Sequence, residues 1–240
     1  MGDWFQKWFG EEYLQLYPHR DGLDAEEMVA LIERTLPDQP PGRVLDICCG
    51  AGRHALAFRD RGFGPIGADL SAHLLERARE VAHVPLVRAD LRALPFRPGS
   101  VGLVVNLFTS FGYFEHDREH VAALREMIKP LRQGGWFVID YLNTTQVIAT
   151  LTSWEETTLG GMPVVIERSL KDGVRFVIKT ITTPDGRQFL ERVRLYPPAE
   201  LIAMIEQAGG RVRHQFGDYH GGPPGPDRPR VILFAQAAAC

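Results

Sequence analysis

Cysteine is scarce in this chain of 240 residues, and its few positions exclude several kinds of protein. Two of the three cysteines, Cys48 and Cys49, are adjacent, a spacing that strains a mutual disulfide. No group of cysteine and histidine residues has the spacing of a zinc site, so we expect no bound metal. The pattern is typical of a reducing compartment, which predicts a cytoplasmic protein.

Charge of one sign and long apolar runs are also lacking. The chain carries 27 Lys and Arg against 30 Asp and Glu, a net charge of −3, so there is no electrostatic footprint for a nucleic-acid partner. Its apolar runs have the length of strands, well short of the roughly 20 residues that a membrane-spanning helix needs. We therefore expect neither a nucleic-acid nor a membrane partner. The apolar content of 45% suffices for one core, with or without an insertion.

The most informative segment is residues 43–70, RVLDICCGAGRHALAFRDRGFGPIGADL. It begins with a short apolar strand, Arg43–Ile47, and continues through a glycine loop at residues 49–52 into a helical pattern. It ends in a second strand with Asp69 at its carboxyl end. This order is typical of a nucleotide-binding βαβ unit, in which a helix N-terminus faces an anionic group and a carboxylate binds ribose hydroxyls.

Two cofactor classes use such a unit. Gly50-x-Gly52-x-x-Ala55, with Asp69 about twenty residues on, satisfies a loose dinucleotide fingerprint and indicates an NAD(P)-dependent oxidoreductase. The fingerprint of those oxidoreductases does not include an acid at the end of the first strand, whereas this chain has Asp46 there. A final hairpin strand would favour the second class.

That second class rests on a resemblance. Residues 44–63 resemble motif I of the class I S-adenosylmethionine-dependent methyltransferases, an acid followed by Gly-x-Gly-x-Gly. Asp46 is the acid, Gly50 and Gly52 match the second and third glycines, and Cys48 replaces the first. Further segments resemble later strands and helices of the family in its order, namely 84–96, 101–114, 124–143, 195–212 and 230–236.

The resemblance implies an α/β fold with a Rossmann-like, mostly parallel seven-stranded sheet covered by helices on both faces. Residues 143–195 depart from it, because short alternating segments separated by turn signals such as Gly160-Gly161 predict a small inserted antiparallel sheet. We expect residues 1–142 and 196–240 to form the methyltransferase domain. The insertion is then a lid, a substrate wall or the contact of a homodimer. The aromatic N-terminal segment predicts a helical cap over the cofactor or a face that packs on the domain.

The resemblance also implies S-adenosyl-L-methionine as cofactor and assigns residues to it. The loop from Cys48 meets the aminocarboxypropyl tail, Asp69 accepts hydrogen bonds from the ribose, and the segment around Asp90 meets adenine. The open alternative for each acid is a strand-end carboxylate without a ligand. The complete expected set is Tyr13, Tyr17, Asp46, Cys48, Gly50, Gly52, Asp69, Leu70, Asp90, Leu91, Asn106 and Leu107.

On the acceptor side, TSFGYF (109–114) resembles the active-site loop of small-molecule N-methyltransferases. Tyr113 is our first catalytic candidate, orienting or deprotonating the nucleophile, and His116 is the second. A packed aromatic and a solvated histidine are the alternatives. We expect methyl transfer to a nitrogen or oxygen of a small molecule. An RNA or other nucleic-acid methyltransferase is the rival, although Asn106-Leu107-Phe108-Thr109 lacks the prolines of amino-methylating adenine enzymes.

Overall fold

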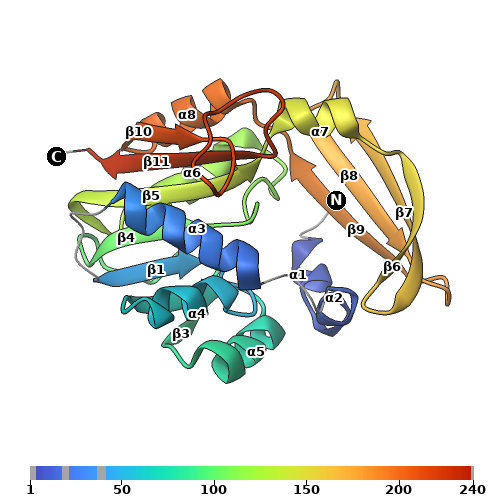
Figure 1. Ribbon diagram of the computed structural model, residues 1–240, viewed down its shortest axis with the longest axis horizontal. Coiled ribbons are helices and arrows are strands. Elements are labelled where there is room, and N and C mark those ends of the chain that lie inside the picture. Colours follow the sequence, from blue (N-terminus) through green and yellow to red (C-terminus); the bar gives the residue numbers. More distant parts are fainter. Residues whose placement is uncertain (1–3, 18–21, 37–41, 239–240) are drawn as a thin grey trace.

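A seven-stranded sheet forms the centre of the computed structural model, which describes residues 4–17, 22–36 and 42–238 (Figure 1). The strand order is β10-β11-β5-β4-β1-β2-β3, and β11 runs antiparallel to both of its neighbours. The four pairings among β1 to β5 are all parallel. The strands are β1 Arg43–Ile47, β2 Gly64–Asp69, β3 Leu86–Arg88, β4 Val101–Asn106, β5 Leu131–Leu142, β10 Gly210–Phe216 and β11 Arg230–Ala237. The final hairpin strand that favours a methyltransferase is therefore present.

Helices cover both faces of this sheet because its strands alternate their side chains between two apolar clusters. In β1, for example, Val44 packs with helices α3 and α4, whereas Leu45 packs with α6 and α8. Helix α5 packs beside α4 and β3. The helices are α3 Gly22–Thr35, α4 Arg53–Asp60, α5 Ala72–Ala82, α6 Asp117–Ile128 and α8 Pro198–Gln207. Because both faces are covered, polar ligands can reach the parallel strands only at their ends.

The predicted insertion contains a separate four-stranded antiparallel sheet in the order β6-β7-β8-β9 (Figure 1). Helix α7, Thr144–Thr150, links β5 to this sheet. Its strands are β6 Trp154–Leu159, β7 Met162–Lys171, β8 Phe176–Thr182 and β9 Gln188–Arg194. Gly160 and Gly161 have positive φ, as the expected turn between β6 and β7 requires. The fold class predicted from the sequence is confirmed, and the division into two domains stays a prediction.

Two short helices of the N-terminal segment, α1 Phe5–Trp8 and α2 Glu11–Leu16, lie between the two sheets (Figure 1). Trp8 and Leu16 are buried with Val164, Ile166 and Ile181 of the inserted sheet. The segment therefore packs against the insertion and also borders the space above the main sheet. No helix in the described ranges is long and apolar enough to cross a bilayer, and these ranges contain no cluster of His, Cys, Asp and Glu suited to a metal ion.

Candidate active site

A cleft of about 900 Å³ opens at the carboxyl ends of the parallel strands, below α1 and α2. Its volume falls within the usual range for small-molecule pockets. The loops after β1, β2, β3 and β4 all contribute to its walls. Ten of the residues expected at the site line it: Tyr13, Tyr17, Cys48, Gly50, Asp69, Leu70, Asp90, Leu91, Leu107 and Tyr113. These ten residues thus share one cleft, and their roles in binding stay a prediction.

The loop after β1 approaches the cleft through Gly50. This residue has φ +54°, and no described atom lies within 4 Å of the position that a Cβ would occupy. Its N–H donates to Asp69 Oδ2 at 2.9 Å. Cys48, which replaces the family's first glycine, also has a positive φ of 61°. A non-glycine residue in this region is strained, and strain of this kind concentrates at functional sites.

Gly52, also expected at the cofactor, does not line the described cleft and faces helix α5. It is buried at the N-cap of α4 with φ +84°. A Cβ at this position would lie 2.9 Å from Ala78 Cβ and 3.3 Å from Ala82 Cβ, both in α5. The glycine therefore lets α4 and α5 approach each other closely.

Asp69 is oriented by the backbone around it. Its Oδ2 accepts from Gly50 N and its Oδ1 from Ser71 N, each at 2.9 Å. Burial raises the pKa of this carboxyl, and the N–H groups of Ser71, Gly50 and Leu70 oppose that rise. Each carboxylate oxygen retains a second lone pair, so the group can accept hydroxyl donors at the cleft surface.

Asp46 and Asn106 are buried at the adjacent ends of β1 and β4 rather than on the described cleft surface. Asn106 Nδ2 donates to Ile47 O at 3.1 Å. Asp46 Oδ2 and Asn106 Oδ1 have no hydrogen-bond partner within the described part of the chain. Burial, followed by the charge of Asp69, raises the pKa of Asp46 to about 8, although Arg53 opposes this. Buried acceptors without donors are costly, so these two atoms fit a donor that the site binds.

Asp90 lines the cleft with both carboxylate oxygens engaged. Its Oδ1 accepts from Arg92 N at 2.9 Å, and its Oδ2 accepts from Arg92 Nη2 at 2.6 Å. The hydrogen bond from the Arg92 side chain lowers the pKa of Asp90 and outweighs its partial burial. A ligand that binds Asp90 therefore shares it with this guanidinium.

The loop after β4 is held by residues that the sequence analysis missed. Phe108 and Thr109 both have positive φ, and Phe108 N donates to the buried carboxylate of Asp140 at 3.0 Å. Arg230 Nε lies 2.7 Å from the other oxygen of Asp140, and Arg53 stands 4.1 Å above the Phe108 ring. The only signal in the sequence is that Asp140 and Arg230 are charged residues in otherwise apolar strands. Their ion pair could not be predicted, because the two residues belong to distant segments.

Tyr113, the first catalytic candidate, lies on the wall of the cleft. Its hydroxyl donates to Thr109 O at 2.8 Å. Its ring centroid lies 5.1 Å from that of Trp4 and 5.7 Å from that of Phe9. The residue therefore joins the N-terminal segment to the loop after β4.

His116 lies elsewhere, at the exposed N-cap of α6, where its N–H donates to Glu119 Oε2 at 3.0 Å. The lining of the cleft, in the described ranges, does not include it. The prediction of a catalytic role for His116 gains no support, because in this segment the lining of the cleft ends at Phe114. His120, one turn further, is buried, and burial lowers its pKa to about 4. Its Nε2 accepts from Phe114 N at 3.2 Å, so its role is structural.

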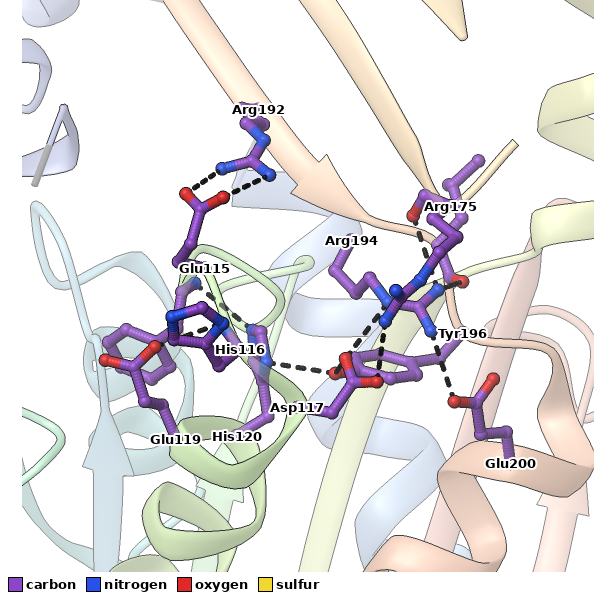
Figure 2. A network of polar contacts seen from close by, with 12 residues as sticks. Glu115, His116, Asp117, Glu119, His120, Arg175, Arg192, Arg194, Tyr196 and Glu200 are labelled. Atoms are coloured by element: carbon purple, nitrogen blue, oxygen red, sulfur yellow. Dashed lines mark hydrogen bonds and ion pairs between the residues drawn. The ribbon is translucent and has the colours of Figure 1, made fainter. Parts of the chain in front are cut away.

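Figure 2 shows the polar network that attaches the inserted sheet to this loop. Asp117, the first residue of α6, accepts from Arg194 Nε at 3.1 Å, Arg175 Nη2 at 2.8 Å and Tyr196 OH at 2.9 Å. His120 Nδ1 lies 2.9 Å from the same tyrosine hydroxyl. One carboxylate thus joins α6 to the end of β9 and to the turn before β8.

A second set of contacts joins β9 directly to the loop. Arg192 forms two hydrogen bonds with the carboxylate of Glu115, at 2.5 and 3.1 Å (Figure 2). Arg194 N donates to Gly112 O at 2.8 Å. Tyr141 OH donates to Arg194 O. The inserted sheet and the wall of the cleft are therefore one connected structure.

Comparisons with known proteins agree with this geometry. Residues 44–135 match the model of a methyltransferase domain. The chain is 30% identical over 172 residues to a demethylmenaquinone methyltransferase of Mycobacterium sp. strain KMS, covering 71% of this chain and 68% of that protein. It is 27% identical over 213 residues to the dTDP-3-amino-3,4,6-trideoxy-alpha-D-glucopyranose N,N-dimethyltransferase of Streptomyces venezuelae, covering 84% and 86%.

Solved structures show the same fold. The CcbJ methyltransferase of Streptomyces caelestis superposes with a TM-score of 0.82 at 21% identity, over 98% of this chain and 99% of that one. An S-adenosylmethionine-dependent methyltransferase of Clostridium acetobutylicum superposes with a TM-score of 0.81 at 16% identity, over 95% and 97%. The glycine loop, strand order and relatives lead to one conclusion: the chain belongs to the class I S-adenosylmethionine-dependent methyltransferases.

Proposed function

We propose that this protein transfers a methyl group from S-adenosyl-L-methionine to a nitrogen or oxygen nucleophile of a small molecule. The observation that carries the proposal is a second cavity of about 500 Å³ between the main sheet and the insertion. It shares Phe9, Phe108 and Tyr113 with the first cleft. Two adjoining chambers with a common wall suit a cofactor and a small acceptor. A chamber of this volume suits a small molecule better than a nucleic-acid duplex.

The residues of the first cleft fit the cofactor. Asp69, oriented by two backbone N–H groups, accepts hydrogen bonds from the ribose hydroxyls. The open space at Gly50 admits the aminocarboxypropyl tail close to the backbone. The unpaired acceptors of Asp46 and Asn106 lie behind this loop and suit the ammonium group of the tail, directly or through water.

The rest of the cleft encloses the nucleoside. Asp90 and Leu91 meet the adenine edge, Leu70 packs on its ring, and Leu107 lines the wall beneath the tail. Tyr13 and Tyr17 of the N-terminal segment close the cleft from above. Cys48 lines the cleft at the start of the loop that meets the tail, and Gly52 shapes that loop at the N-cap of α4.

The bound cofactor supplies a methyl group on a positively charged sulfur, which is a good leaving group. The protein contributes orientation and exclusion of water. Tyr113 performs both tasks, since its ring separates the two chambers while its hydroxyl is fixed on Thr109 O. We further propose a cytoplasmic location and treat the homodimer as a hypothesis for the exposed part of the insertion.

Calorimetric titration with S-adenosylhomocysteine, S-adenosylmethionine and NAD tests the proposal. We expect the two sulfur compounds to bind and NAD not to bind. Asp69→Asn should weaken their binding about 10- to 100-fold, the scale of a charge-assisted hydrogen bond. Asp227→Asn, in an exposed loop, is the matched control. A screen of amine and hydroxyl metabolites with radiolabelled cofactor then identifies the acceptor. Preference for NAD, or equal affinity in the Asp69 variant, would refute the assignment.

A further inference from the structure

The wall that the inserted sheet presents to the second cavity carries a row of charged side chains. Glu155 in β6, Arg168 in β7, Lys179 in β8 and Glu191 in β9 all line this cavity. Arg168 is directly opposite Lys179, and Lys179 is directly opposite Glu191. One charged residue therefore comes from each strand, in the order acid, base, base, acid.

The row lies beside the apolar contact between the insertion and the N-terminal segment. The apolar part of the same sheet face, including Ile166 and Ile181, is buried against the N-terminal helices. Ile166 is directly opposite Ile181, and the next pair on the same face is Arg168 opposite Lys179. Side chains two positions apart in a strand point to the same side. The charged row therefore lies at the border between the N-terminal segment, which it contacts through Trp8 and Tyr17, and the cavity.

The two cations lie at the centre of the row, and each forms an ion pair with the acid beside it. Arg168 Nη2 lies 2.9 Å from Glu155 Oε1, and Lys179 Nζ lies 3.3 Å from Glu191 Oε2. Glu191 Oε1 also accepts from Trp8 Nε1 at 2.9 Å. Lys179 Nζ also donates to Tyr17 OH, and Arg168 Nη1 donates to Thr152 O at 3.4 Å. The two bases thus lie side by side at the centre of the row, each held by an acid and by a second acceptor.

Like charges in directly opposite positions destabilise a sheet, because their Cβ atoms are only about 5 Å apart. The arrangement becomes favourable when an anion lies between them. Arg168 and Lys179 offer complementary donors, a planar fork and a compact ammonium group, and both suit an oxyanion.

The part of this cavity that adjoins the cofactor cleft has an aromatic wall, beside which Arg230 is paired with Asp140. Phe108 and Tyr113 form the shared wall, and Val193 and Leu142 continue it. Because Asp140 neutralises Arg230, an acceptor in this cavity can place an apolar group against the aromatic wall and its charged group against the inserted sheet.

We propose that Arg168 and Lys179 bind an oxyanion of the methyl acceptor, a carboxylate or a phosphate, and so select acceptors that carry one. This inference rests on the proposed function, since it assigns the second cavity to the acceptor. Glu155 and Glu191 hold the two cations in place. The specificity determinant is thus in the insertion, while the cofactor residues are in the main sheet.

Binding of small probes to the protein saturated with S-adenosylhomocysteine tests the inference. Phenyl phosphate, benzoate, benzyl alcohol and benzylamine share an aromatic ring for the apolar end and differ in charge. We expect at least one of the two anions to bind about tenfold or more tightly than benzyl alcohol. We expect benzylamine to bind most weakly. The stronger of phenyl phosphate and benzoate identifies the oxyanion.

Arg168→Gln and Lys179→Met should each remove most of the preference for the anion. Lys171→Met is the control, because this lysine lies at the exposed end of β7 outside the lining of the cavity. Equal binding of all four probes, preference for benzylamine, absence of anion binding, or an unchanged preference in both variants would overturn the inference. Retained binding of S-adenosylhomocysteine in every variant shows that the proposed function itself has not failed.

Discussion

Two glycines of the loop after β1 should respond differently to the same substitution. Gly50 and Gly52 have φ values of +54° and +84°, so alanine is strained at either position by about 1–2 kcal/mol. Their surroundings differ. Gly50 borders the cleft with no described atom within 4 Å of a Cβ, whereas Gly52 faces α5.

A steric clash with α5 is expected in one of the two variants only. In Gly52→Ala the new methyl group would lie 2.9 Å from Ala78 Cβ and 3.2 Å from Ala78 Cα, so the backbone of α5 must move. Overpacking of this kind costs about 1–3 kcal/mol. With the strain, Gly52→Ala should lose about 2–5 kcal/mol of unfolding free energy, and Gly50→Ala only about 1–2 kcal/mol. The methyl group of Gly50→Ala should instead obstruct the cofactor and weaken its binding more than about tenfold, a change of about 1.4 kcal/mol.

Urea unfolding and calorimetric titration with S-adenosylhomocysteine measure the two effects. Gly161→Ala is the control for strain alone, because this hairpin glycine has φ +82°, no described atom within 4 Å of a Cβ, and a position outside the cleft lining. Gly50→Ala should match this control in stability and differ from it in binding. The reasoning fails if Gly50→Ala binds like the wild type, or if Gly52→Ala is as stable as Gly161→Ala.

Three further predictions concern buried and networked charges. A double-mutant cycle of Asp117→Asn and Arg194→Met should give a coupling energy of about 1 kcal/mol in urea unfolding. The value is at the low end for residues of one network, because the Asp117 side chain is 40% exposed. Zero coupling would contradict a shared network. His120 has a folded pKa of about 4 against an ordinary 6.5, so the unfolded state binds its proton first as pH falls. From pH 7 to 5 the wild type should lose about 2 kcal/mol relative to His120→Gln, and parallel pH profiles would exclude this assignment. Burial raises the pKa of Asp46 to about 8, so its contribution to stability decreases as pH rises toward that value. Asp46→Asn should therefore gain stability relative to the wild type between pH 5 and pH 8 in the same assay, and a constant difference would mean that Asp46 ionises normally.

Features that depend on neighbouring residues in the chain could be predicted from the sequence. The strand Arg43–Ile47, the glycine turn and the acid at the end of β2 are all encoded within 27 residues, 43–69, and the structure has them where expected. The engagement of Asp90 by Arg92 is equally local, since the two residues are two positions apart. That pairing could have been anticipated from the Asp-x-Arg spacing.

Features that depend on packing between distant segments could not be predicted. The sequence offers no sign that Gly52 meets α5, because that contact depends on how two helices cross. His116 and His120 are one turn apart, and only the position of α6 decides that the first is exposed and the second buried. The ion pair of Asp140 and Arg230 joins residues far apart in sequence. Its role in supporting the loop after β4 required the three-dimensional structure.

The connections of this loop have a consequence for how specificity can change. The hydrogen bond from Arg194 N to Gly112 O joins β9 to the loop after β4. The ion pair of Arg192 with Glu115 is a second link between the same two segments. The insertion therefore cannot shift without moving the wall that the two cavities share. The Lys179 side chain lines the second cavity and donates to Tyr17 OH, and it can change without altering that backbone link. Acceptor selection should thus vary through single substitutions on the inserted sheet, while changes at the β9 junction should impair cofactor and acceptor binding together.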